Sequence, residues 1–265
     1  MAQAPTRDEV FKRLAKSALD GYLGLFVGTG FSIALTNGRA PNFKKLLQEV
    51  CGELNIAFDF GDAAAVLGKS FPQVASSLVE LRAREMLKLA PTGSDPDLVG
   101  QSALNEVRQA IATKTNLQPD PLLRAPYKAV LAKVSPSWIV TTNYDFILEA
   151  LFDRSTSLLP ENFLLPSTKL VPIYHLHGHR RRPESIVVTE EDYVGLFGPL
   201  EYRQLKLTLL VAESSTVMLG YSLGDINVRA ALSWARGFLL CPPRQPGHGQ
   251  GKKTPAGEEI GKEHV

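Results

Sequence analysis

The stretch that most constrains this chain is Leu23–Ser32, which reads Leu-Gly-Leu-Phe-Val-Gly-Thr-Gly-Phe-Ser. Its first half is apolar and has the length of one buried strand, too short for a helix. Its second half is a glycine-rich turn, Gly28-Thr29-Gly30, with Ser32 two residues further on. Glycine lets backbone N–H groups approach an anion, and a helix that follows adds positive potential. Alone, the stretch fits a phosphate loop and an ordinary tight turn equally well, because the third glycine of the dinucleotide fingerprint is missing.

Strand patterns alternate with helical patterns along the rest of the chain, which predicts a parallel α/β sheet. Thr6 and Glu9 form a capping box that marks the start of the first helix. After the strand in Leu23–Ser32, we expect strands at Ser137–Thr142, Val171–Leu176, Ser185–Thr189 and Ser215–Tyr221. We expect helices at Thr6–Leu19, Phe43–Leu54, Leu98–Ile111, Tyr127–Val134, Phe146–Phe152, Leu200–Ala212 and Ile226–Leu240, with a proline-rich connection at Gln118–Pro126.

One folded domain, residues 1–241, accounts for these elements. Between about residues 45 and 125 no strand pattern interrupts the helices, which indicates an inserted helical module. Residues 242–265 are rich in Gly, Pro, Lys and Glu, so we expect a disordered C-terminal tail. The two cysteines, Cys51 and Cys241, are far apart and form no metal-spaced pair, so each is expected to be a buried small residue.

Composition limits the class of protein that we expect. A hydrophobic content of 44% with 21% charged residues is that of an ordinary globular protein. The net charge of +2 and the lack of a basic arm give no sign of direct nucleic-acid binding. No apolar run has the length of a membrane span, and charges from Arg7 to Lys16 interrupt any signal-peptide core. We therefore expect a cytoplasmic protein without a membrane partner.

Polar clusters follow several of the predicted strands, at the sheet edge where α/β proteins bind ligands. Asn143 and Asp145 come directly after the strand at Ser137–Thr142. An Asn there can orient a water or a sugar hydroxyl, whereas capping of the next helix is the ordinary role of both residues. The late turn Gly220-Tyr-Ser222-Leu-Gly-Asp225 resembles the first one, and either holds a second sugar or phosphate or caps the last helix.

Three alternating histidines, His175, His177 and His179, end the strand at Val171–Leu176. Alternation places them on one face of an extended strand. Three interpretations stay open: histidines satisfied by backbone carbonyls, a general base, or a metal site. The following Arg180-Arg181-Arg182 is either a phosphate contact or, more simply, a solvated loop.

Taken together and in order, these clusters resemble the sirtuin-like NAD-binding family, especially its divergent prokaryotic branch. The glycine turn at Gly28–Ser32 resembles the family's Gly-Ala-Gly-x-Ser, and Pro41-Asn-Phe with Leu46-Leu47 resembles the element after it. Thr141-Thr-Asn143-Tyr-Asp145 matches the Thr-Gln-Asn-x-Asp motif, His177-Gly178 the histidine–glycine pair, and Gly220-Tyr-Ser222-Leu the late turn. The match extends from about Leu23 to Leu240. The resemblance implies a Rossmann-like parallel sheet with helices on both faces.

The same resemblance implies NAD⁺ glycohydrolysis, which gives nicotinamide and ADP-ribose. Asn143 would position the attacking water and His177 would act as the base, while His175 lies outside the histidine–glycine pair and is expected to matter far less. The implied NAD⁺-binding residues are Gly28, Thr29, Gly30, Ser32, Asp145, Gly220, Ser222 and Asp225. Alternatives are a sirtuin-like protein deacylase or ADP-ribosyltransferase, and a non-catalytic nucleotide-sensing subunit.

The departures from the family are informative as well. Protein-deacylating sirtuins hold a zinc with four cysteines, but this chain has two in total, so we expect no zinc. Lys44 stands where those enzymes have an arginine. Members of the divergent branch often deplete NAD⁺ in phage defence and must stay silent until triggered. With no room for a second sensor domain in 265 residues, control is expected from a homo-oligomer or a regulatory partner protein.

Overall fold

The computed structural model describes residues 5–61, 69–163, 170–196, 202–224 and 226–240. The strands are β1 (Leu23–Val27), β2 (Trp138–Thr141), β3 (Ser155–Leu158), β4 (Val171–His175) and β5 (Ser215–Leu219). The helices are α1 (Arg7–Leu19), α2 (Thr29–Leu35), α3 (Phe43–Leu54), α5 (Phe71–Leu89), α6 (Pro96–Lys114), α7 (Pro121–Val134), α8 (Glu190–Val194), α9 (Tyr202–Glu213) and α10 (Ile226–Leu240), with short 3₁₀ turns at Pro160–Asn162 and Pro183–Ser185. The predicted tail and Cys241 lie outside the described residues.

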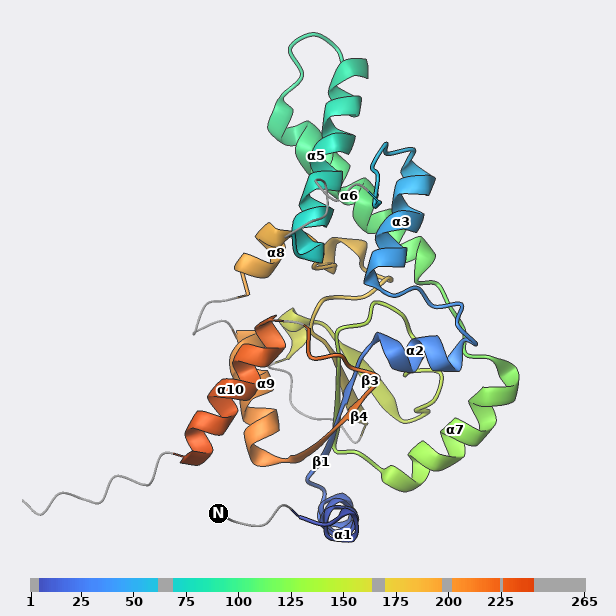
Figure 1. Ribbon diagram of the computed structural model, residues 1–265, viewed down its shortest axis with the longest axis vertical. Coiled ribbons are helices and arrows are strands. Elements are labelled where there is room, and N and C mark those ends of the chain that lie inside the picture. Colours follow the sequence, from blue (N-terminus) through green and yellow to red (C-terminus); the bar gives the residue numbers. More distant parts are fainter. Residues whose placement is uncertain (1–4, 62–68, 164–169, 197–201, 225, 241–265) are drawn as a thin grey trace, which may run out of the picture.

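The five strands form one sheet in the order β3-β4-β2-β1-β5, and every neighbouring pair is parallel. Apolar side chains of β1, β2 and β4 alternate between two cores, as the strand period requires. On one face Leu25, Ile139 and Ile173 pack with α2 and α7. On the other face Phe26, Val140 and Tyr174 pack with α9 and α10 (Figure 1). The predicted Rossmann-like α/β sheet with helices on both faces is confirmed.

A helical layer formed by α3, α5 and α6 stands apart from the sheet faces (Figure 1). These helices share a core of their own that includes Leu47, Val74, Leu78 and Ile111. The predicted boundaries of α3 match the structure, because Asn42 caps the Lys45 N–H at its start. Helix α7 begins at Pro121, inside the stretch predicted as a connection, and it packs on the sheet rather than in this layer. A proline in the first turn of a helix loses no hydrogen bond, so composition misjudged this start.

Two further predictions differ from the structure, and one strand was not predicted. Phe146–Phe152 forms successive turns and not a regular helix. Ser185–Thr189 forms no strand, because its backbone is used in local bonds such as Val187 N–H to the His177 carbonyl. Strand β3, Ser155–Leu158, was missed because its Ser-Thr-Ser-Leu sequence lacks an apolar run. Cys51 is buried as predicted, and burial raises the pKa of its thiol to about 11.

Candidate functional site

Strand register brings the polar clusters together at the carboxyl edge of the sheet. Val27 pairs with Thr141 of β2 and with Leu219 of β5, and Thr141 pairs with His175 of β4. Gly28, Asn143, His177 and Gly220 therefore leave neighbouring parallel strands one or two residues past the same level. The pairing of strands thus brings together residues, such as Gly28 and Asn143, that are more than a hundred positions apart in the sequence.

The two glycine turns are packed directly against each other. The N–H of Gly28 donates to the Leu219 carbonyl at 2.9 Å, and the N–H of Gly30 donates to the Gly220 carbonyl at 2.8 Å. A Cβ on Gly30 would lie 2.9 Å from that same oxygen, and one on Gly220, whose φ is +60°, would lie 2.1 Å from the Phe31 nitrogen. These glycines are thus required by the contact between turns. The backbone N–H groups of Gly28 and Gly30, which the sequence suggested as anion ligands, therefore donate hydrogen bonds to the second turn and to the end of β5.

Asn143 is joined to the first glycine turn by its side chain. Its Nδ2 donates to Ser32 Oγ at 3.0 Å, and its Oδ1 accepts from Thr29 Oγ1 at 3.2 Å. The Asn143 backbone N–H donates to Thr141 Oγ1 at 3.0 Å. With 6% of its surface exposed, the side chain is fixed in orientation by partners on two elements. Such an amide can present one face to a ligand while its other groups stay satisfied.

Asp145 lies beneath this arrangement. Its Oδ1 accepts from the Ile147 N–H at 3.1 Å, and its carboxylate also bonds the Ser32 hydroxyl. Burial raises the pKa of Asp145 despite these hydrogen bonds. The bond to Ile147 N–H is the local Asx role considered from the sequence, but it closes a turn and caps no regular helix.

The three histidines separate because β4 ends at His175. The His175 and His179 rings contact each other at 5.1 Å between centroids. The His177 ring contacts Tyr193 of α8 at 5.1 Å, and its Nδ1 lies 3.4 Å from the Tyr193 hydroxyl. Gly178, with a φ of +74°, turns the chain between them. The expectation of one shared face is therefore wrong.

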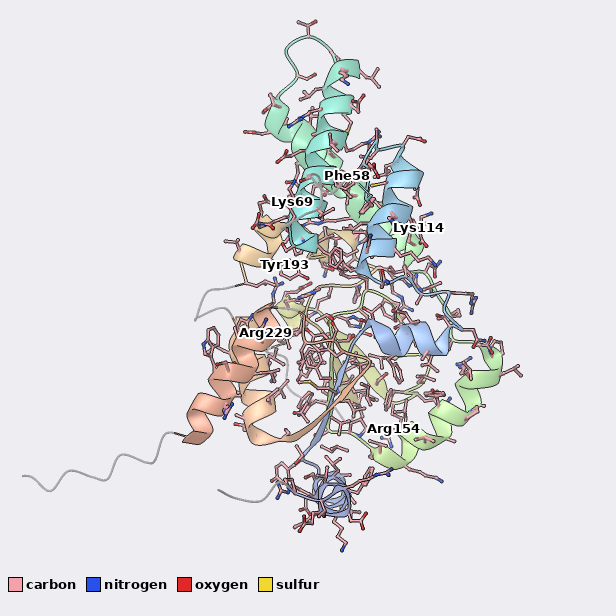
Figure 2. All side chains as sticks on the ribbon, in the orientation of Figure 1. Phe58, Lys69, Lys114, Arg154, Tyr193 and Arg229 are labelled. Atoms are coloured by element: carbon pink, nitrogen blue, oxygen red, sulfur yellow. The ribbon has the colours of Figure 1, made fainter. Side chains whose placement is uncertain are left out.

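His177 is buried, with 3% of its surface exposed, and the small cavity next to it is lined by the polar side chains of Arg203 and Gln204 as well as by leucines. The leucines are Leu176, Leu196 and Leu207. In Figure 2, Tyr193 lies between Lys69, just before α5, and Arg229 of α10. The element that carries Tyr193 is tied to the helical layer, since Arg108 of α6 pairs with Asp192 at 2.8 Å and Gln73 of α5 donates to Glu190 at 2.9 Å.

The predicted NAD⁺-binding residues fall into an exposed group and a buried group. Thr29, Gly30, Gly220 and Ser222 reach the surface and form a rim over the buried Gly28, Ser32, Asn143 and Asp145. Asp225 lies outside the described residues. Of the arginines, Arg181 lies 4.0 Å over the Phe146 ring, and Arg182 pairs with Glu161 and Glu184. Arg182 is thus the solvated residue expected from the sequence.

One residue of the candidate site, Glu149, was not predicted from the sequence. Glu149 approaches His175 from the turns after Asp145, at 2.8 Å between Oε1 and Nε2. The only signal was an acidic residue in an otherwise apolar stretch, Phe-Ile-Leu-Glu-Ala-Leu. Among the residues that the structure describes, no group of three or more His, Cys, Asp or Glu side chains is placed to hold a metal ion.

A parallel sheet with glycine turns and polar residues at its carboxyl edge defines the Rossmann-like class of α/β proteins. Within that class, residues 137–240 match the model of the SIR2-like domain. The chain is also 23% identical over 235 residues to defense-associated sirtuin 2 of Bacillus subtilis, covering 86% of this chain and 20% of that protein. It is 22% identical over 236 residues to the NAD(+) hydrolase ThsA of Acinetobacter baumannii (strain 532279), covering 84% of this chain and 41% of that protein.

Residues 137–240 are therefore similar to the SIR2-like domain, and most of the chain is similar to proteins named as a defence-associated sirtuin and an NAD(+) hydrolase. It spans about a fifth and about two-fifths of the length of these two relatives. In the parts of the chain that the structure describes, no helix combines the length and the apolar character needed to cross a bilayer.

Proposed function

We propose that this protein is an NAD⁺ glycohydrolase that releases nicotinamide and ADP-ribose. One observation carries the proposal: the Asn143 amide bridges Thr29 and Ser32 of the glycine turn, so the group that would orient water is built into the turn that would hold the substrate. The name of the Acinetobacter relative, an NAD(+) hydrolase, supports the same reaction.

In this proposal the diphosphate lies along the rim formed by Thr29, Gly30, Gly220 and Ser222. The bond between the ribose C1′ and the nicotinamide nitrogen breaks, and its electron pair leaves with neutral nicotinamide. Asn143 orients the water that attacks C1′, and His177 accepts the proton that this water loses. Buried dipoles around the sugar stabilise its oxocarbenium-like charge more effectively than water would.

Control of the activity is part of the proposal. His177 is covered by Tyr193 of α8, and α8 is bonded to the helical layer through Asp192 and Glu190. This arrangement supports a resting state in which the base is shielded from substrate. We propose that assembly into a homo-oligomer or binding of a partner protein uncovers it. We expect weak turnover in a dilute monomer and strong turnover in a larger assembly. Light scattering on the same samples measures the assembly state.

The direct test is incubation of the purified chain with NAD⁺, followed by quantification of nicotinamide and ADP-ribose. Release of both products without any acyl-peptide or protein acceptor is expected, and Asn143→Ala serves as the matched inactive control. Release that requires an acetylated peptide would indicate a deacylase, and labelling of a protein acceptor would indicate an ADP-ribosyltransferase. Saturable NAD⁺ binding without cleavage, in every assembly state, would indicate a nucleotide-sensing subunit.

A further inference from the structure

His175 makes two buried hydrogen bonds that link Asn143 to an acidic residue. Its Nδ1 lies 3.2 Å from the backbone carbonyl oxygen of Asn143. Its Nε2 lies 2.8 Å from Glu149 Oε1. The ring is fully buried and stands at the last position of β4, two residues before His177. The minor role expected for His175 from the sequence does not fit these contacts.

The partners of His175 decide where its protons are. A backbone carbonyl can only accept, so Nδ1 must carry a proton. An ionised carboxylate also only accepts, so both ring nitrogens of His175 face hydrogen-bond acceptors. Burial raises the pKa of Glu149, but hydrogen bonds from His175 and Ser157 and the charge of His175 outweigh it and hold that pKa below its ordinary value. Glu149 is therefore ionised, in agreement with this assignment.

We propose that His175 and Glu149 form a positioning pair for Asn143. The inference rests on the proposed function, in which Asn143 orients the attacking water. Thr29 and Ser32 fix the Asn143 side chain, while His175 fixes the peptide group that follows it. Glu149 holds the imidazole by its other nitrogen and is itself held by Ser157 Oγ, which donates to Oε1 at 2.6 Å. The Asn143 residue is thus held at its side-chain amide by Thr29 and Ser32 and at its backbone carbonyl by His175.

Location supports positioning over simple core packing. Asn143 has no regular helix behind it, because the chain after Asp145 forms turns, so no helical ladder fixes its carbonyl. Within the described part of the chain, the charged and titratable groups near the pair are Asp145, His179 and Arg180, and the group that contacts the Asn143 carbonyl is His175 Nδ1. A donor on β4, in register with β2, is what holds this oxygen.

A matched pair of substitutions separates the two bonds of the ring. In His175→Asn the side-chain amide nitrogen lies near the former Nδ1 and can still donate to Asn143. In His175→Gln the amide lies near the former Nε2 and can reach only Glu149. We expect kcat for NAD⁺ cleavage to fall by about tenfold or more in His175→Gln, and by about threefold or less in His175→Asn, with KM nearly unchanged in both. Equal kcat values in the two variants would overturn the proposal.

Glu149→Gln provides a second test that does not remove the ring. It keeps an oxygen for Nε2 and removes the negative charge that faces the ring. We expect kcat to fall to a value between those of the parent and His175→Gln, again with KM nearly unchanged. A kcat equal to that of the parent would remove Glu149 from the pair.

An NMR measurement keeps the inference testable without turnover. Ring ¹⁵N shifts of His175, assigned by their loss in His175→Asn, should show a proton on Nδ1 in the parent. The Tyr144 amide shares its peptide plane with the Asn143 carbonyl, so its resonance should move in His175→Gln and stay close to the parent in His175→Asn. An unprotonated Nδ1 or an unmoved Tyr144 amide contradicts the positioning pair. A parent that never cleaves NAD⁺, with these signals as expected, contradicts only the proposed reaction.

Discussion

Asn143 and His177 leave neighbouring strands at the same level of the sheet, but the structure holds them in different ways. Asn143 has hydrogen-bond partners on its side chain and on its backbone, and they come from helix α2 after β1 and from strands β2 and β4. His177 lies beside a cavity lined by leucines, Arg203 and Gln204, and it contacts Tyr193 of α8, a helix that is bonded to the helical layer. Asn143 is fixed by bonds at the sheet edge, whereas His177 is covered by α8, which lies outside the sheet.

This difference indicates a division of labour within one site. A water-orienting amide needs a fixed direction, which a network of bonds to rigid strands supplies. A base that must stay unused until activation is better placed where a separate element can shield it. Substitutions on either side should therefore have different effects.

Asn143→Ala should have the largest effect on activity. Removing the amide abolishes orientation of the water, so the catalytic rate should fall by about 10²-fold or more. The variant also leaves the Thr29 and Ser32 hydroxyls without this partner, and a loss of roughly 1–2 kcal/mol of stability is expected. Turnover and thermal unfolding measure the two effects. The exposed Asn116, substituted in the same way, is the matched control and should change neither.

His177→Ala should lower the rate by a similar factor of about 10² once the enzyme is activated. In the resting form the expected difference is smaller, because the base is covered by Tyr193 there. Single-turnover assays of parent and variant, in dilute and in assembled samples, separate these cases. If the variant cleaves NAD⁺ as fast as the parent in the active form, His177 is not the base.

Gly30→Ala should act on the contact between the two glycine turns. The new Cβ would lie 2.9 Å from the Gly220 carbonyl oxygen, so a backbone must move, and the expected cost is about 1–3 kcal/mol. NAD⁺ affinity should fall with it, because the rim of the site is made by both turns. Gly52→Ala in the interior of α3 meets nothing within 4 Å and should instead stabilise the protein by about 0.5–1 kcal/mol. Denaturant unfolding of the two variants is the comparison.

Asp145→Asn should change the pH dependence of stability. Burial raises the pKa of Asp145, so the folded state binds this proton more tightly than the unfolded state does. The contribution of Asp145 to stability is therefore present at low pH and is lost as the pH rises from its unfolded pKa through its folded pKa. Unfolding free energies of the parent minus those of the variant should decrease across this range. A flat difference would show that Asp145 is not buried as an acid.

The sheet and most residues of the candidate site could be predicted from the sequence, because both depend on local patterns. Apolar runs of strand length followed by glycine or asparagine were sufficient to place Gly28, Asn143 and His177 at one edge. The contact of Gly30 with the second turn could not be predicted, because the atom that its missing Cβ would meet belongs to Gly220, far along the chain. Glu149 and the cover over His177 depend on how turns pack, and no periodicity encodes such packing.

Tyr193→Phe should have the smallest effect and is the sharpest test of the cover over His177. The hydroxyl lies 3.4 Å from His177 Nδ1, near the limit of a hydrogen bond, so its removal should change the rate by no more than about twofold. The aromatic ring keeps its edge-to-face contact with His177, and the melting temperature should stay close to that of the parent. Tyr193→Ala removes the ring as well and should raise turnover in dilute samples by exposing His177. If Tyr193→Phe alone lowers the rate tenfold, the hydroxyl itself orients His177, and α8 belongs to the catalytic arrangement as well as to its cover.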